Sequence, residues 1–134
     1  MLITNHIQEA VEEARKVVDR YLGGKYFEGS ICPYALAHWL GYILIHTEEE
    51  LSSCGVEYRL HDYGYAGDRI IEYNKDLVDN DLYMATCIGH IWLGHLKNLD
   101  DPIVDIYPWG SVFSPLEVEV ASAFGREVME IYYD

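Results

Sequence analysis

The chain has 134 residues, a length that fits one domain. Half of the residues are apolar and 13% are aromatic, a composition that can form a packed core and excludes wholesale disorder. Nine basic residues stand against 23 acidic ones, which gives a formal net charge of −14. Because such a surface repels phosphate, direct binding to DNA or RNA is not expected.

The sequence carries no mark of export. The opening stretch "MLITNHIQEA" has neither the basic nor the apolar region of a signal peptide. No apolar run approaches the roughly 20 residues that span a bilayer. Cys32, Cys54 and Cys87 are an odd number of cysteines without CxxC spacing, which is typical of reduced thiols. We therefore expect a cytoplasmic protein that does not bind membranes.

The first half of the chain predicts two helices. Residues 5–24 have apolar side chains at helical spacing, with Asn5 as the expected N-cap and a glycine pair as the stop. Residues 32–41 predict a second, shorter helix, in which Pro33 suits the first turn and Gly41 ends the run.

Three short strands are expected next, over residues 42–47, 56–61 and 69–73, the last two joined by a glycine-containing turn. A third helix is predicted over residues 80–97. Its expected apolar stripe consists of Leu82, Ala85, Ile88, Gly89, Trp92 and Leu96.

Residues 100–113 are expected to form an irregular connection. The last helix then begins with a capping box, in which Ser114 is the N-cap, Pro115 occupies the first turn and Glu117 follows three residues after the cap. Its expected apolar face begins at Leu116. Helices, short strands and then helices again predict a small α+β domain.

The stretch "ATCIGHIWLGH" at residues 85–95 contains two histidines in a setting that is similar to a zinc-peptidase helix. A zinc-peptidase helix places two histidines four residues apart on one face, with a glutamate after the first histidine that activates the zinc-bound water. His90 and His95 are five residues apart, which in a continuous helix turns the second side chain roughly 140° away from the first. These two histidines therefore do not form an HExxH pair, and His95 is expected near the last helical turn.

If His90 is instead the second histidine of the pair, the first ligand position falls on Thr86 and the base position on Cys87. In that register the stretch is similar to "AHEIGHxxLGH", a form common in the ImmA/IrrE-type metallopeptidase family. The preceding "RIIEYN" resembles the strand before that family's metal helix. "EVEVASAFGREVM" resembles its second conserved block, which supplies a glutamate as the third ligand, and "CPYALAHWLGYILI" resembles the segment leading into its first strand. The resemblance covers residues 32–129.

This resemblance implies one zincin-like, ImmA/IrrE-like domain over residues 1–134. It has a helical N-terminal extension at residues 1–30, a short three-stranded sheet and two C-terminal helices that form the former metal site. His90 and Glu119 occupy surviving ligand positions, whereas Thr86 and Cys87 replace a ligand and the catalytic base. Threonine is a poor zinc ligand and a thiol cannot replace the carboxylate base. The resemblance therefore predicts a pseudopeptidase with no catalytic residues and no bound zinc.

Other interpretations of the same residues remain open. His90 can be a hydrogen-bonded histidine in a half-buried groove, and Cys87 a buried small apolar side chain. Cys87 can also act as a nucleophile beside His90. A rebuilt zinc site can combine Cys87, His90 and Glu119, which would make the chain an active metallopeptidase.

The sequence-based hypothesis for function is a non-catalytic regulator or inhibitor that binds another protein through a groove at Thr86, Cys87, His90 and Glu119. The acidic surface favours a basic, DNA- or RNA-binding partner such as a repressor, in a bacterial, phage or mobile-element setting. A plainer alternative is that the acidity serves solubility. Another is an accessory protein whose fold matters only for assembly of a complex.

Overall fold

The computed structural model describes residues 3–23, 29–47, 58–62, 69–74, 80–97, 99–107 and 110–133. Its elements in chain order are α1 (Ile3–Leu22), β1 (Gly29–Ser30), α2 (Pro33–Trp39), β2 (Ile43–Thr47), β3 (Tyr58–Asp62), β4 (Arg69–Asn74), α4 (Asn80–Trp92), β5 (Ile103–Tyr107), β6 (Gly110–Ser111), α5 (Pro115–Glu130) and β7 (Tyr132–Tyr133). The expected α+β class is confirmed. None of the described helices is long and apolar enough to cross a membrane.

The sheet has the strand order β2-β4-β3-β5-β6, in which β2 runs parallel to β4 and the other pairs are antiparallel. Four of its strands have five or six residues, and β6 has two. The three expected strands are present as β2, β3 and β4, but the expected three-stranded sheet is wrong, because β5 and β6 extend it to five strands. A separate two-stranded pairing joins β1 to β7 near the C-terminus.

The expectation of an irregular segment at residues 100–113 is wrong, because β5 and β6 lie within it. Ile103 is 38% exposed and Val104 is buried, so the side chains alternate between two faces as in a half-buried strand. Val104 pairs with Leu60 of β3, and that cross-strand contact fixes the register. Pro102 and Pro108 flank this strand, and prolines at both ends are also typical of an irregular connection.

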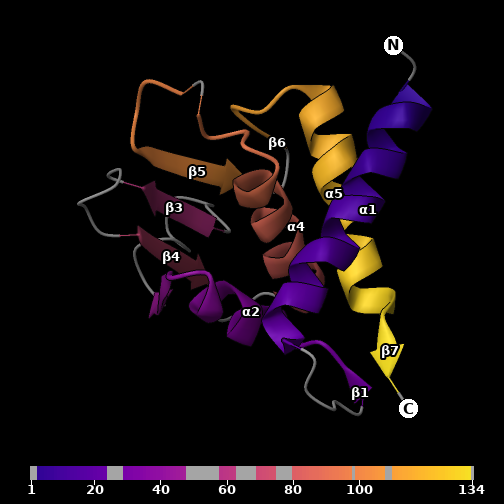
Figure 1. The fold of residues 1–134 in the computed structure, drawn as a ribbon. Coiled ribbons are helices and arrows are strands. Elements are labelled where there is room, and N and C mark those ends of the chain that lie inside the picture. Colours follow the sequence, from indigo (N-terminus) through magenta and orange to yellow (C-terminus); the bar gives the residue numbers. More distant parts are fainter. Residues whose placement is uncertain are drawn as a thin grey trace.

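Helix α4 lies between the sheet and the pair formed by α1 and α5 (Figure 1). Leu60, Ile71 and Val104 are buried on the sheet, and they belong to the same core cluster as Ile88 of α4. The remaining core comes from α1, α2 and α5, which contribute the buried residues Ala10, Ala14, Val17, Val18, Leu36, Ala37, Val120, Phe124 and Val128. The N-terminal helix is therefore part of the packed core.

A polar contact joins α1 to the end of α4. The indole nitrogen Nε1 of Trp92 donates a hydrogen bond to Oε2 of Glu13 at 2.8 Å. This bond and the nearby Lys16 ammonium lower the pKa of the Glu13 carboxyl. The Arg20 guanidinium lies 5.6 Å from the centre of the Trp92 ring, which adds a cation–π contact. The far end of α4 is thus held against the N-terminal helix.

Several predicted helix boundaries hold and others do not. Pro33 and Pro115 occupy first-turn positions, and Ser114 and Glu117 form the expected capping box. Asn5, however, is not an N-cap, because α1 begins at Ile3 and Asn5 lies inside the helix. Two further side chains assigned to buried helix faces, Leu82 and Leu116, are 41% and 40% exposed.

Helix α4 ends at Trp92, so the expectation of a helix up to residue 97 is also wrong. Gly94 has φ +81°, a left-handed conformation that glycine adopts without strain. The His95 N–H donates to the His90 carbonyl at 3.0 Å, and the Gly94 N–H donates to the Ile91 carbonyl at 3.2 Å. This pair of bonds is a Schellman motif, the common way for a glycine to end a helix. It turns the chain back towards His90.

Candidate functional site

Helices α4 and α5 approach each other backbone to backbone at two glycines. A methyl group built on Gly89 would lie 2.8 Å from the carbonyl oxygen of Ala121. A methyl group built on Gly125 would lie 2.7 Å from Oγ1 of Thr86 and 2.8 Å from its backbone nitrogen. All three distances are shorter than real carbon contacts allow, so only glycine fits at these positions. The space between the two helices is therefore filled at the level of Thr86.

Thr86, the position at which the family has its first histidine, is directed at this contact. Its side chain is half-buried, and Oγ1 donates a hydrogen bond to the Leu82 carbonyl one turn earlier at 2.9 Å. This local bond is the usual way for a threonine inside a helix to satisfy its hydroxyl. The hydroxyl is thus engaged with its own helix beside Gly125.

Cys87 lies in the hydrophobic core with 2% of its surface exposed. Among the described residues, neither Cys87 nor the exposed Cys32 is in a disulfide, and Cys54 falls outside the described residues. Because a thiol must reach its substrate to act as a nucleophile, burial of Cys87 favours its interpretation as a small apolar core residue.

His90 is the one buried polar or charged residue in the described part of the chain, at 4% exposure. Its ring stacks on Phe113, with the ring centres 3.9 Å apart and the planes 12° from parallel. Its Nδ1 lies 2.8 Å from Nδ1 of His95, and the Schellman motif that ends α4 creates this approach. The sequence-based argument that the two histidines diverge assumed a continuous helix, and the structure overturns it.

Burial keeps both imidazoles neutral. Removal from water, together with the smaller effect of the neighbouring His95, lowers the pKa of His90 to about 3. Burial also lowers the pKa of His95, while the Glu117 carboxylate acts in the opposite direction. A hydrogen bond between two neutral imidazoles requires one Nδ1 to carry the proton and the other to accept it. His90 and His95 are therefore joined by one hydrogen bond between their Nδ1 atoms, and the ring of His90 stacks on Phe113.

Glu119, the expected third-ligand position, lies on the exposed surface of α5. Ala121 faces α4, and a residue two positions away on a helix points about 200° from it. Glu119 is thus directed away from the α4 contact that contains Thr86. Within the described ranges, no three side chains of histidine, cysteine, aspartate or glutamate are grouped so as to hold a metal ion.

The structure thus brings Thr86, Cys87 and His90 together on α4 but not with Glu119. Sequence reasoning missed His95 and Phe113 as neighbours of His90, and Glu117 as a charge beside His95. The glycine in "LGH" was the available signal, because a glycine followed by a contact residue at a helix end is typical of a Schellman motif. Glu117 belongs to the capping box of α5 and also supplies the charge that acts on His95.

No protein-family model matches this chain, and neither a curated protein nor a solved structure gives a significant match.

Replacing Gly89 or Gly125 with alanine should lower the free energy of unfolding by about 1–3 kcal/mol, because the added methyl group meets backbone atoms. Chemical denaturation monitored by circular dichroism measures the change. The exposed Arg126→Ala, next to Gly125 on the same helix, is the matched control and should change stability by less than about 0.5 kcal/mol. Unchanged stability of both glycine variants would contradict the close helix contact.

The histidine pair predicts a loss of stability in acid. His90 has a folded pKa of about 3 and an unfolded pKa of about 6.5, so the unfolded chain binds the extra proton between these values. The free energy of unfolding should fall as pH drops from about 6.5 towards 3, by up to about 1.4 kcal/mol per pH unit for each such proton.

The variant His90→Phe keeps a ring against Phe113 and removes this proton, so denaturation at pH 7.5 and pH 5 should show a smaller loss than in the wild type. Glu117 faces His95 and is unchanged in the variant. His38→Ala, at an exposed position of α2, should retain the wild-type dependence. Equal pH dependence in the wild type and His90→Phe would mean that His90 is not held neutral.

Proposed function

We propose that this chain is a non-catalytic, ImmA/IrrE-like protein that acts by binding another protein. The helix–sheet–helix order is then a degenerate form of the zincin-like arrangement, in which α4 and α5 correspond to the former metal helices. The observation that carries the proposal is the close contact at Gly125, where the backbone of α5 lies against Oγ1 and the backbone nitrogen of Thr86, the position of the family's first ligand. The burial of Cys87 and the outward direction of Glu119 support it further.

The chemistry of the remaining residues also favours a role without hydrolysis. The thiol at the base position is buried, and a general base must reach the water or group whose proton it takes. His90 is stacked on Phe113 and engaged with His95, which leaves it as a packing residue of the α4 end. The same arrangement gives no support to the rival hypothesis of a metal site rebuilt from Cys87, His90 and Glu119.

The partner that fits best is a basic protein, because the chain carries a formal charge of −14. Opposite net charges accelerate association, and like charges suppress it. A nucleic-acid-binding protein such as a repressor has the required surface. The chain would then act as a regulator or inhibitor, in the bacterial or mobile-element setting that the resemblance implies.

Restoring the family motif tests the loss of zinc chemistry. The double variant Thr86→His, Cys87→Glu rebuilds an HExxH sequence on α4, yet it should bind no stoichiometric zinc and should unfold about 1–3 kcal/mol more easily, because the larger side chain at position 86 meets the Gly125 backbone. Elemental analysis after dialysis against zinc and chemical denaturation measure the two effects.

Tyr83→His, at an exposed position of the same helix, is the control for adding a histidine without overpacking. One zinc ion per chain in the rebuilt variant would contradict the proposal. Zinc bound to the wild type and lost in His90→Ala or Glu119→Ala would establish the rival metallopeptidase.

The binding role is tested with the tagged wild-type chain in its native cell, followed by reconstitution with the purified captured protein. We expect to capture a basic protein that remains intact in the complex. Its affinity for the chain should fall as the sodium chloride concentration is raised. Cleavage of that protein, abolished by His90→Ala, would overturn the non-catalytic assignment. Capture of only acidic proteins, or binding that salt does not weaken, would overturn the choice of partner.

A further inference from the structure

Two adjoining pockets lie beside β5, on the segment that connects α4 to the sheet. The first, of about 220 Å³, is lined by Leu60, Asp62, Leu96, Lys97, Leu99, Asp101, Pro102 and Val104. The second, of about 460 Å³, is lined by Leu99, Asp100, Asp101, Ile103, Val104, Asp105 and Val112. They share Leu99, Asp101 and Val104, so together they form one groove. We call it the β5 groove.

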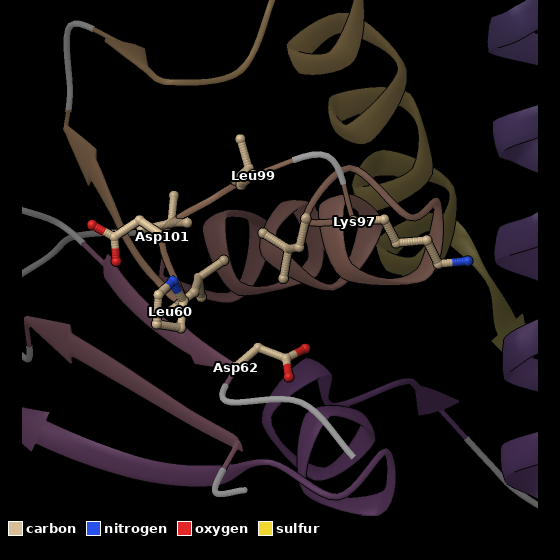
Figure 2. A pocket seen from close by; sticks show the side chains of 8 residues that line it. Leu60, Asp62, Lys97, Leu99 and Asp101 are labelled. Carbon is tan, nitrogen blue, oxygen red and sulfur yellow. The ribbon is translucent and has the colours of Figure 1, made fainter.

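The β5 groove combines apolar walls with a rim of one charge. Four aspartates and one lysine line it, and the remaining lining residues are leucine, isoleucine, valine or proline. Figure 2 shows the carboxylates of Asp62 and Asp101 on either side of Leu60, whereas the ammonium of Lys97 is directed away from both. The cation in the lining therefore does not neutralise these two carboxylates.

Local contacts hold the rim in place. The Asp62 backbone N–H donates to the Pro102 carbonyl at 2.9 Å, which ties the end of β3 to the start of β5. The side chain of Asp101 accepts a hydrogen bond from the Ile103 N–H at 2.9 Å. These bonds fix the aspartates before any partner arrives, and such preorganisation reduces the entropy cost of binding.

Part of the rim charge is already matched within the chain. Asp105 receives two hydrogen bonds from the Arg59 guanidinium, at 2.6 and 3.2 Å. Asp62 accepts a hydrogen bond from the Tyr42 hydroxyl at 3.4 Å and has Arg69 at 3.9 Å. The exposed carboxylates of Asp100 and Asp101 are therefore the stronger positions for an external cation.

We propose that the β5 groove binds arginine or lysine side chains from an extended basic segment of a protein partner. The proposal rests on the proposed function and names the surface that would perform it. Long basic side chains place an aliphatic stem on apolar surface and a cation at its edge, which matches leucine and valine walls below an aspartate rim. Arginine fits best, because its planar guanidinium forms two hydrogen bonds to one carboxylate.

The surroundings of the groove favour a side chain over other ligands. The first pocket is smaller than the roughly 300–1,000 Å³ of ordinary small-molecule sites, whereas the second falls within that range, so the choice of occupant rests on charge and apolar contact. Ile103 and Val112, at 38% and 61% exposure, line the second pocket and offer apolar contact to the partner's neighbouring residues. The aspartate rim repels nucleic-acid phosphates, so the occupant is the basic protein itself.

The test titrates the isotope-labelled full chain with a short blocked peptide in which arginine alternates with glycine, followed by nuclear magnetic resonance. The amide signals of Leu60, Leu99 and Val104 should shift to saturation. Asp100→Asn combined with Asp101→Asn should lower the affinity for the peptide by roughly 3- to 30-fold, since each exposed ion pair contributes modestly. The asparagine at position 101 can still accept the Ile103 N–H, so the fold is kept.

The matched control is Glu9→Gln combined with Glu12→Gln, which removes the same charge from exposed positions of α1. It should change the affinity by at most about twofold, because salt screens distant charges. The peptide with citrulline in place of arginine should not bind. Equal weakening in both double variants, shifts spread over the whole acidic surface, or no saturable binding would each overturn the groove assignment.

The groove and the proposed function can fail separately. If the basic partner captured by the wild type binds the Asp100, Asp101 double variant equally well, the function stands and the β5 groove is not its surface. If the wild type captures no basic protein while the peptide still binds as described, the groove stands as a cation-side-chain site and the proposed function fails.

Discussion

The contact between α4 and α5 is the constraint on which the rest of the structure depends. Gly89 and Gly125 let two helical backbones approach to a distance that no other residue would allow. That approach places Thr86 against α5 and buries Met84, Ala85, Cys87 and Ile88 between the sheet and the helices. Because interiors are close-packed, this contact leaves no room for a larger side chain at either glycine.

The C-terminal end of α4 and the connection that follows it have different roles in this arrangement. At its C-terminal end, Trp92 binds α1 through Glu13, and the Schellman motif returns His95 to His90. The chain that follows leads directly to the β5 groove, which includes Leu96, Lys97 and Leu99. Helix α4 thus supports the connection that follows it, and the acidic lining of the β5 groove lies on that connection. In many proteins binding residues are carried by loops that a scaffold positions.

Sequence patterns predicted the helices and three of the strands because local rules decide them. Pro33, Pro115 and the Ser114 capping box are local signals that the structure retains. The missed features depend on residues far apart in the sequence. Strand β5 exists because Val104 meets Leu60, and Asn5 lies within a helix that begins before it. Short segments whose partners are distant give no periodic pattern of their own.

In the candidate site, too, local rules predict some features, whereas others depend on contacts between distant residues. The register that places Thr86, Cys87 and His90 on one helix could be predicted, since it follows from helical spacing. The direction of Glu119 depends on which face of α5 meets α4, and the glycines decide that. The approach of His95 could not follow from an ideal helix, because one residue with positive φ changes the path of the chain. A single glycine can therefore reverse an inference made from helical angles.

The bond between His90 and His95 has a consequence for the outer atoms of both rings. A neutral imidazole that donates from Nδ1 has an accepting Nε2, and one that accepts at Nδ1 has a donating Nε2. The two Nε2 atoms must therefore have opposite character, one giving a hydrogen and one receiving it. Transfer of the single bridging hydrogen, with compensating exchange at the outer atoms, would invert both at once. The two possible tautomer arrangements at the end of α4 therefore have the same charge and differ in which Nε2 atom donates.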